Sequence, residues 1–156
     1  MQFSHLVRIN DPGDRHNSPL SREQLWRGLV LRAENPLLFV PGLERFEIVG
    51  RSDVQMMRIL HFGGVSLRDR VLFSPMHAVR YEIEASTQTP AAVLAMAIVE
   101  PEPGQLFVRF DYETALPAAR QDGDIEGMLR QAYAQSDLDT IRTIRRLLSP
   151  SGQDQD

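Results

Sequence analysis

The feature that most constrains the fold is a series of six short apolar segments followed by one long helical pattern. The segments span residues 43–51, 54–62, 65–74, 77–86, 91–100 and 105–114, and short breaks rich in glycine, proline and small polar residues separate them. Segments of this length that are rich in β-branched and aromatic residues predict strands, and breaks this short favour hairpins. The sequence therefore predicts an antiparallel meander with sequential pairing.

Each predicted strand has one apolar and one charged face. Val79, Tyr81 and Ile83 alternate with arginine and glutamate, and residues 108–113 repeat the pattern. Residues 124–148 instead carry apolar side chains at helical spacing, namely Ile125, Met128, Leu129, Ala132, Ile141, Ile144 and Leu148, with Asp124 as the expected cap. A helix of about 25 residues spans roughly 37 Å, so it can cross a sheet of this size. One sheet face is then buried against the helix.

The N-terminal region predicts a strand and a helix. Phe3, His5, Val7 and Ile9 alternate with other residues at the two-residue period of a strand. Ser21 and Gln24 have the spacing of a capping box, and the helix that they open ends near residues 35–36. Its apolar side contains Leu25, Trp26, Leu29 and Ala33, while Arg22, Arg27, Arg32 and Glu34 fall mostly elsewhere. Residues 37–42 are short and bounded by proline, so a one-turn helix or a tight loop is expected there.

These elements define an α+β fold in which a curved antiparallel sheet of about seven strands wraps around a long C-terminal helix. We expect a single domain over residues 1–148 and a disordered tail over 149–156. A strongly twisted sheet cannot touch a straight helix along its full width, so space remains between them. That space is the predicted site for a small apolar ligand.

This order of elements resembles the helix-grip superfamily, which includes START lipid-transfer domains, pollen-allergen-like proteins and polyketide cyclases. Within it, residues 3–12 (FSHLVRINDP), 20–34 (LSREQLWRGLVLRAE) and 39–42 (FVPG) resemble the AtaL-like family of bacterial and fungal proteins. The resemblance covers essentially the whole chain and implies a pocket for a hydrophobic ligand. It supplies no catalytic residues that can be carried over to this sequence, because a shared fold does not transfer a reaction.

Composition excludes several classes of function. The chain has no cysteine, so disulfides, zinc–thiolate sites and cysteine nucleophiles are ruled out, and a cytoplasmic location is expected. A net charge of -4 opposes binding to nucleic acid, and no apolar run is long enough to span a membrane. The four histidines lack metal-ligand spacing, and phosphate-binding, nucleophile-elbow and dinucleotide motifs are missing. No metal or cofactor is predicted.

Four polar residues in the predicted strands are candidates for the site, each with a structural alternative. His5 shares a face with Phe3 and Val7, so it either hydrogen-bonds a ligand or is a satisfied core histidine. Arg58 either holds a carboxylate or phenolate of the ligand or pairs with Asp69 on the adjacent strand. Asp69 interrupts an apolar row, which makes it a candidate for a buried carboxyl group with a raised pKa or for one half of an ion pair. His61 lies in the row opposite to Arg58, and the sequence leaves open which row faces inward.

Aromatic and apolar residues complete the predicted site. Tyrosine hydroxyls can orient a ligand, and methionines can provide an adaptable lining, although packing alone also explains both. The predicted ligand-binding set is His5, Trp26, Phe39, Arg58, Asp69, Tyr81, Phe110 and Met128, with Tyr112 and Tyr133 as further hydroxyls. His77 fits a turn, and the arginines Arg142, Arg145 and Arg146 fit a solvated helix end.

Three functions agree with this pattern. The leading hypothesis is a protein that binds a small hydrophobic or aromatic ligand. A cyclase- or aromatase-like enzyme is the second, and it requires Asp69, His5 and Arg58 to converge in one cavity. An interaction module with a filled cavity is the third. A homodimer through the sheet edge is compatible with all three, although no sequence feature specifies it.

Overall fold

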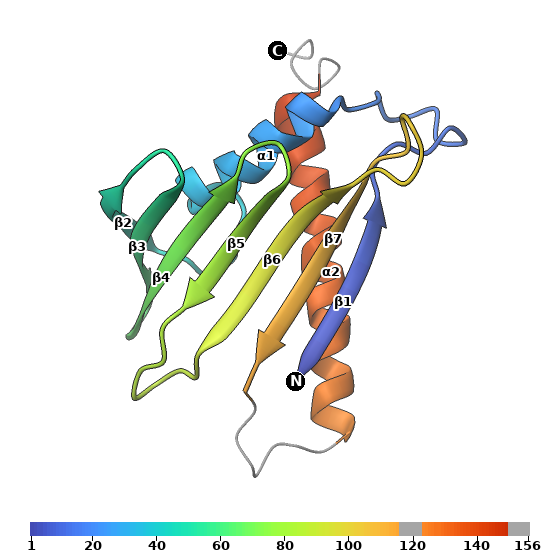
Figure 1. Ribbon diagram of the computed structural model, residues 1–156. Helices are drawn as coiled ribbons and strands as arrows, with labels where there is room; N and C mark the ends of the chain where they lie inside the picture. Colours follow the sequence, from blue (N-terminus) through green and yellow to red (C-terminus); the bar gives the residue numbers. More distant parts are fainter. Residues whose placement is uncertain (116–122, 150–156) are drawn as a thin grey trace.

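In the part of the chain that the structure describes, seven strands form one antiparallel sheet. The structure is a computed structural model that describes residues 1–115 and 123–149 (Figure 1). Its elements in chain order are β1 (Gln2–Arg8), α1 (Arg22–Glu34), η1 (Pro36–Leu38), β2 (Arg45–Arg51), β3 (Gln55–Phe62), β4 (Val65–Ser74), β5 (Ala78–Ile83), β6 (Ala92–Val99), β7 (Phe107–Thr114) and α2 (Gly123–Leu148). The strand order in the sheet is β1-β7-β6-β5-β4-β3-β2, so the predicted meander is confirmed and β1 is added at its edge by pairing with β7.

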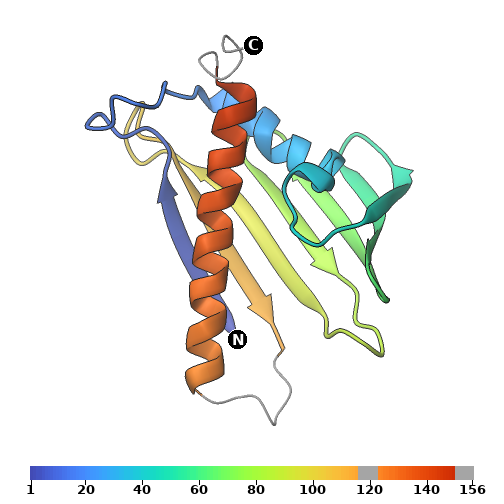
Figure 2. The same cartoon turned by 180° about the vertical axis from the view of Figure 1, so that it is seen from behind.

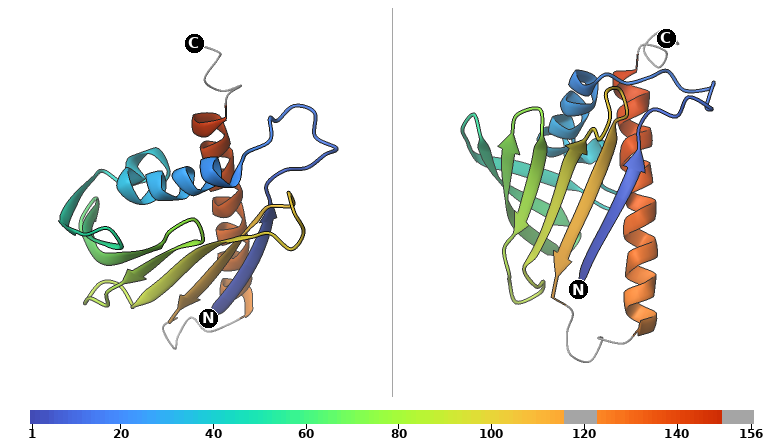
Figure 3. Two further views of the ribbon diagram at one scale, coloured as in Figure 1. Left: turned by 45° about the horizontal axis from the view of Figure 1, so that its top comes forward. Right: turned by 45° about the vertical axis from the view of Figure 1, so that its right-hand side comes forward.

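Both helices lie on the same, concave side of the sheet. Figure 2 shows α2 running along β1 and β7, while α1 crosses the sheet at the end where α2 terminates. The tilted views in Figure 3 show the sheet curving around the two helices. The predicted capping box of α1 is present, because the Gln24 backbone N–H donates to Ser21 Oγ at 3.1 Å and the Ser21 N–H donates to Gln24 Oε1 at 2.8 Å. None of the helices in the described ranges is long and apolar enough to cross a membrane.

The two helices cross at Gly28 of α1. A methyl group at this position would overlap the side chain of Ile144 in α2, so the absence of a side chain sets the approach of the helices. Both residues are buried, and they lie against the apolar face of the sheet. The crossing therefore fixes α1 over one half of the concave face.

The strand register arranges the inward-facing side chains in rows that cross the sheet. One row consists of Met56, Val71, Tyr81, Leu94, Tyr112 and Phe3, and the next consists of Phe73, Val79, Met96, Phe110 and His5. Arg58 pairs with Asp69, which pairs with Ile83, so these two polar residues occupy the row on the other side of Tyr81. On β3, Met56 and Arg58 therefore face inward, and His61 faces outward.

The predicted inner face of α2 is correct only in its C-terminal half. Ile141 and Ile144 are buried, but Met128 is 70% exposed and Ala132 is also exposed. The inward-facing line instead runs through Tyr133 and Asp137, because a shift of one residue along a helix turns a side chain by about 100°. Asp124, Ile125 and, apart from Ser149, the predicted tail lie outside the residues whose side chains are described.

Candidate functional site

Helix coverage divides the concave face into a closed half and an accessible half. Beneath α1 and the end of α2, inward-facing residues such as Val79, Met96 and Val108 are no more than 1% exposed. Further along the same strands, Ile83 and Leu94 also face inward, yet they are only partly buried. Apolar side chains on the predicted ligand-binding face therefore remain accessible beyond the helix crossing.

Arg58 and Asp69 form a buried, bidentate ion pair. Arg58 Nε donates to Asp69 Oδ1 at 2.9 Å, and Nη2 donates to Asp69 Oδ2 at 2.5 Å. Arg58 Nη1 donates to the backbone carbonyl of Ala33 in α1 at 2.9 Å. Every nitrogen of this guanidinium group has a partner within the protein, so the structural alternative for Arg58 is the one that the structure shows. The pair joins the sheet to the C-terminal end of α1.

Arg32, one helical turn from Gly28 in α1, projects toward the same region. Its Cζ lies 5.1 Å from the centroid of the Tyr81 ring. Arg58 Cζ lies at the same distance from that centroid. Both arginines are thus within cation–π range of one tyrosine. Arg32 Nε and the Tyr81 hydroxyl are buried, and neither has a hydrogen-bond partner in the part of the chain that the structure describes.

A second polar cluster connects β1, β7 and α2. Asp137 of α2 is only 1% exposed, and its Oδ2 lies 3.1 Å from His5 Nδ1. The hydroxyl of Tyr112 donates to Asp137 Oδ1. The Tyr112 ring stacks on Tyr133 of α2, with centroids 4.1 Å apart and planes inclined by 8°. Both carboxylate oxygens are therefore engaged, and aromatic rings flank the cluster.

Burial dominates the electrostatics of this cluster. It raises the pKa of Asp137 above the ordinary value, while hydrogen bonds from Tyr112 and His5 and the charge of Arg32 act in the opposite direction. Burial also raises the pKa of Tyr112, with a further contribution from its hydrogen bond to Asp137. The pKa of Tyr133 is raised by burial as well. The two tyrosines therefore remain neutral hydrogen-bond donors at neutral pH.

The predicted catalytic set does not converge. His5 lies on β1, whereas Asp69 lies on β4, with β7, β6 and β5 between them in the sheet. His5 and Arg58 each have a different carboxylate partner, Asp137 and Asp69 respectively. The enzyme hypothesis in its original form, which placed all three residues in one cavity, therefore loses its geometric basis.

The remaining predicted residues differ in their accessibility. Tyr81 adjoins the accessible half, and Trp26 and Phe39 are partly buried and pack against the core. Phe110 is fully buried, next to the partly exposed His5 on the adjacent strand, and Met128 projects into solvent. His77 lies in the turn before β5, as predicted, and His61 contacts Ser66 and Glu47 on the convex side.

Sequence reasoning missed Asp137 and misplaced Arg32. Asp137 precedes Ile141 and Ile144 by four and seven residues, so helical spacing already places it on the apolar face of the last helix. Arg32 follows Leu29 by three residues, which likewise places it near the inner side of α1. A charged residue in phase with an apolar face was the signal in both cases.

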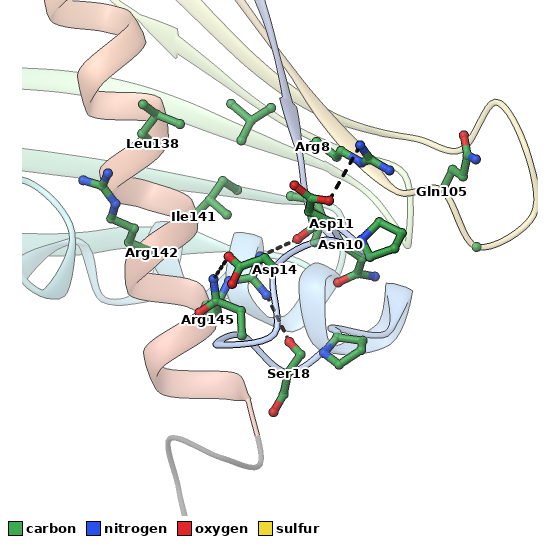
Figure 4. Close-up of a pocket in the computed structure, with 16 residues that line it drawn as sticks. Arg8, Asn10, Asp11, Asp14, Ser18, Gln105, Leu138, Ile141, Arg142 and Arg145 are labelled. Atoms are coloured by element: carbon green, nitrogen blue, oxygen red, sulfur yellow. Dashed lines mark hydrogen bonds and ion pairs between the residues drawn. The ribbon is translucent and has the colours of Figure 1, made fainter.

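A separate hollow of about 650 Å³ lies between the residues after β1 and the C-terminal half of α2 (Figure 4). Arg145 of α2 lines it and donates to the backbone carbonyls of Ser18, at 3.0 Å, and of Ile9. Arg145 is partly buried and makes these two hydrogen bonds, so it is not the solvated helix-end arginine that the sequence predicts, and burial lowers its pKa. Because these contacts hold the loop against α2, we assign Arg145 a structural role.

No cluster of metal-ligating side chains occurs within residues 1–115 and 123–149. Arg58 binds the buried carboxylate of Asp69, and His5 and Tyr112 contact the buried carboxylate of Asp137. The candidate site is therefore the accessible half of the concave face, bordered by Arg32, Tyr81, Tyr112 and Asp137.

Comparison with known proteins identifies the family. The sequence profile of the acetylaranotin biosynthesis cluster protein L family, AtaL, matches residues 3–151. The chain belongs to the AtaL family. No curated protein matches its sequence significantly.

Solved structures confirm the helix-grip fold of this AtaL protein. The Zhui aromatase/cyclase from Streptomyces sp. R1128 is 14% identical, with a TM-score of 0.62 and coverage of 97% of this chain and 98% of that chain. The allergen Ara h 8.0201 is 12% identical, with a TM-score of 0.60 and coverage of 92% and 97%. The di-domain aromatase/cyclase StfQ from the steffimycin biosynthetic pathway is 9% identical, with a TM-score of 0.70, and the match covers 97% of this chain but 52% of StfQ. At these identities the likeness shows the fold.

Proposed function

We propose that this protein binds a small hydrophobic or aromatic molecule on the accessible half of the concave face, beside α2. The observation that carries the proposal is the change in burial along single strands. Met96 of β6 is 1% exposed, whereas Leu94, two residues earlier and on the same face, remains partly exposed. Accessible apolar side chains on a concave face provide the burial that drives binding, at about 25 cal/mol per Å² of apolar surface before association costs.

The aromatic residues beside Leu94 favour a flat or ring-containing ligand. Tyr81 and Tyr112 lie on either side of Leu94 in the same cross-strand row. Tyr133 stacks on Tyr112 from the helix side. Aromatic surfaces arranged in this way offer stacked or edge-to-face contacts to a ligand ring.

A direct test uses the uncharged fluorescent dye N-phenylnaphthylamine and two tryptophan variants of β6. Leu94→Trp fills the accessible half of the concave face, while Val93→Trp adds the same side chain to the convex face one residue away. We expect wild type and Val93→Trp to bind the dye and Leu94→Trp to lose most of that binding. Far-UV circular dichroism and thermal melting check that both variants fold. Equal dye binding by the two folded variants would place any binding site elsewhere.

A cyclase-like enzyme is a second candidate, and the contact between His5 and Asp137 favours it. A carboxylate that orients a histidine is a common arrangement for proton transfer. Proton abstraction from an aromatic β-diketone can be followed by NMR as hydrogen–deuterium exchange at the carbon between the carbonyl groups. We expect His5→Asn to slow that exchange while leaving dye binding intact. Exchange that the wild-type protein does not accelerate would count against catalysis and leave the binding proposal unaffected.

A further inference from the structure

Two neighbouring polar groups at the candidate site have no hydrogen-bond partner among residues 1–115 and 123–149. Arg32 Nε and the Tyr81 hydroxyl are both buried without a hydrogen bond, and Arg32 Cζ lies 5.1 Å from the Tyr81 ring centroid. Tyr81 as a whole is only 3% exposed. Buried polar atoms in native proteins are almost always hydrogen-bonded, so two adjacent exceptions call for an explanation.

The nearby carboxylates do not supply the missing partner. Asp69 faces the same region from β4, but both of its oxygens accept from Arg58. Asp137 faces it from α2, and its oxygens are engaged by His5 and Tyr112. Among the described residues, no carboxylate oxygen lies within 4.0 Å of the Arg32 guanidinium nitrogens. In contrast to Arg58, Arg32 therefore has no carboxylate contact among the described residues.

The chemistry of the two groups specifies what would satisfy them. A guanidinium group only donates hydrogen bonds, and a tyrosine hydroxyl can donate one more. An oxygen acceptor can serve both, and a negatively charged oxygen also compensates a partly buried cation, which is costly when left unpaired. Arg32 is itself only partly buried, so part of its side chain remains accessible from the open half of the concave face.

Resting on the proposed binding function, we propose that the ligand is an aromatic or apolar molecule that carries an oxyanion, such as a carboxylate, phenolate or sulfonate. Arg32 binds the oxyanion, and the Tyr81 hydroxyl is its second donor. The apolar part of the ligand then extends over Leu94 toward Tyr112, which lies in the same cross-strand row as Tyr81. This assigns to Arg32 the role of anion holder that the sequence suggested for Arg58.

The test compares two dyes that share an anilino-naphthalene skeleton and differ in one sulfonate group. Anilinonaphthalene sulfonate carries the anion, and N-phenylnaphthylamine lacks it. Affinities are measured by fluorescence titration for wild type, Arg32→Met and Tyr81→Phe. Arg27→Met is the matched control, because Arg27 is an exposed arginine of the same helix. Circular dichroism verifies that each variant is folded, and Arg32→Gln provides a second variant if Arg32→Met is not.

We expect Arg32→Met to weaken binding of the sulfonate dye at least tenfold and to change binding of the neutral dye less than twofold. Tyr81→Phe should give a smaller selective loss, and Arg27→Met should change neither affinity. Unchanged sulfonate binding by folded Arg32→Met, or an equal loss of both dyes, would overturn the proposal. If the wild-type protein does not bind the neutral dye, or if Leu94→Trp does not reduce that binding, the proposed function itself would be overturned.

Discussion

Replacing Asp69 by asparagine should destabilise the protein strongly, because it leaves a buried arginine without its counter-ion. Arg58 is 3% exposed and directs two of its nitrogens to the Asp69 carboxylate. The substitution keeps the side-chain volume but removes the negative charge and one acceptor oxygen. The third nitrogen keeps its bond to the Ala33 carbonyl, so Arg58 cannot swing out to solvent without breaking that contact as well.

The magnitude follows from the burial of the pair. Breaking a buried ion pair by removing one partner costs about 3–5 kcal/mol of unfolding free energy. For a chain of this length, each kcal/mol corresponds to roughly 2–4 °C in Tm, so Asp69→Asn should melt roughly 6–20 °C below wild type. Replacing both residues at once, by Arg58→Met and Asp69→Leu, removes the unpaired charge and should recover most of the lost stability.

Urea unfolding followed by circular dichroism measures these differences. Asp111→Asn is the matched control, since Asp111 forms an ion pair with Arg109 that is exposed on the convex side of β7. An exposed pair contributes about 0–1 kcal/mol, so this control should lie close to wild type. If Asp69→Asn and Asp111→Asn are destabilised equally, or if the double variant is less stable than Asp69→Asn, the structural role assigned to the buried pair is wrong.

Three further predictions concern α1 and α2. Burial raises the pKa of Asp137, so the folded state holds that proton more tightly than the unfolded chain, and wild-type stability falls as the pH rises from 3.8 through the folded-state pKa. An asparagine side chain does not titrate, so the unfolding free energy of Asp137→Asn minus that of wild type should increase with pH over this window and then level off. Urea unfolding from pH 4 to 8 measures this difference. A difference that does not change with pH would contradict the raised pKa of Asp137. Gly28→Ala should lower the unfolding free energy by roughly 1–3 kcal/mol, because the added methyl group overlaps Ile144. Gly127→Ala, on an open part of α2, should raise it by up to about 1 kcal/mol. Melting curves that rank the two variants in the reverse order would refute the close helix crossing. Met128→Gln should change the unfolding free energy by no more than about 0.5 kcal/mol, since Met128 is 70% exposed, and a larger loss in the same assay would indicate a buried position.

The strands were predictable because their pattern is local. Two-residue alternation and short breaks placed all six meander strands within a few residues of their observed limits, as for Val65–Ser74, and the capping box at Ser21 placed the start of α1. The fixed period of a strand also makes its inner and outer rows unambiguous once one row is known.

The site was less predictable, because it depends on which elements meet. Asp69 had a foreseeable partner on the adjacent strand, but nothing local indicates that His5 meets Asp137, 132 residues away in sequence. Met128 was misplaced because the wide apolar pattern of the last helix permits several orientations near its N-terminal end, and the packing of Tyr133 against Tyr112 selects one of them. Arg32 was grouped with the charged residues that fall mostly off the apolar side of the first helix, although it follows Leu29 by three residues.

The pairing of β1 with β7 has a consequence for the order of folding. Strands β2 to β7 each pair with a neighbour in sequence, so they can form as a growing series of hairpins while the chain is being synthesised. β1 is made before the other six strands, yet its strand partner lies at residues 107–114, and His5 also contacts Asp137 of α2. β1 therefore stays an unpaired, half-apolar strand until β7 has been synthesised. We expect β1 to pair with β7, and α2 to dock beside them, late in folding. Before then, a chaperone or an aggregating neighbour can compete for the exposed β1.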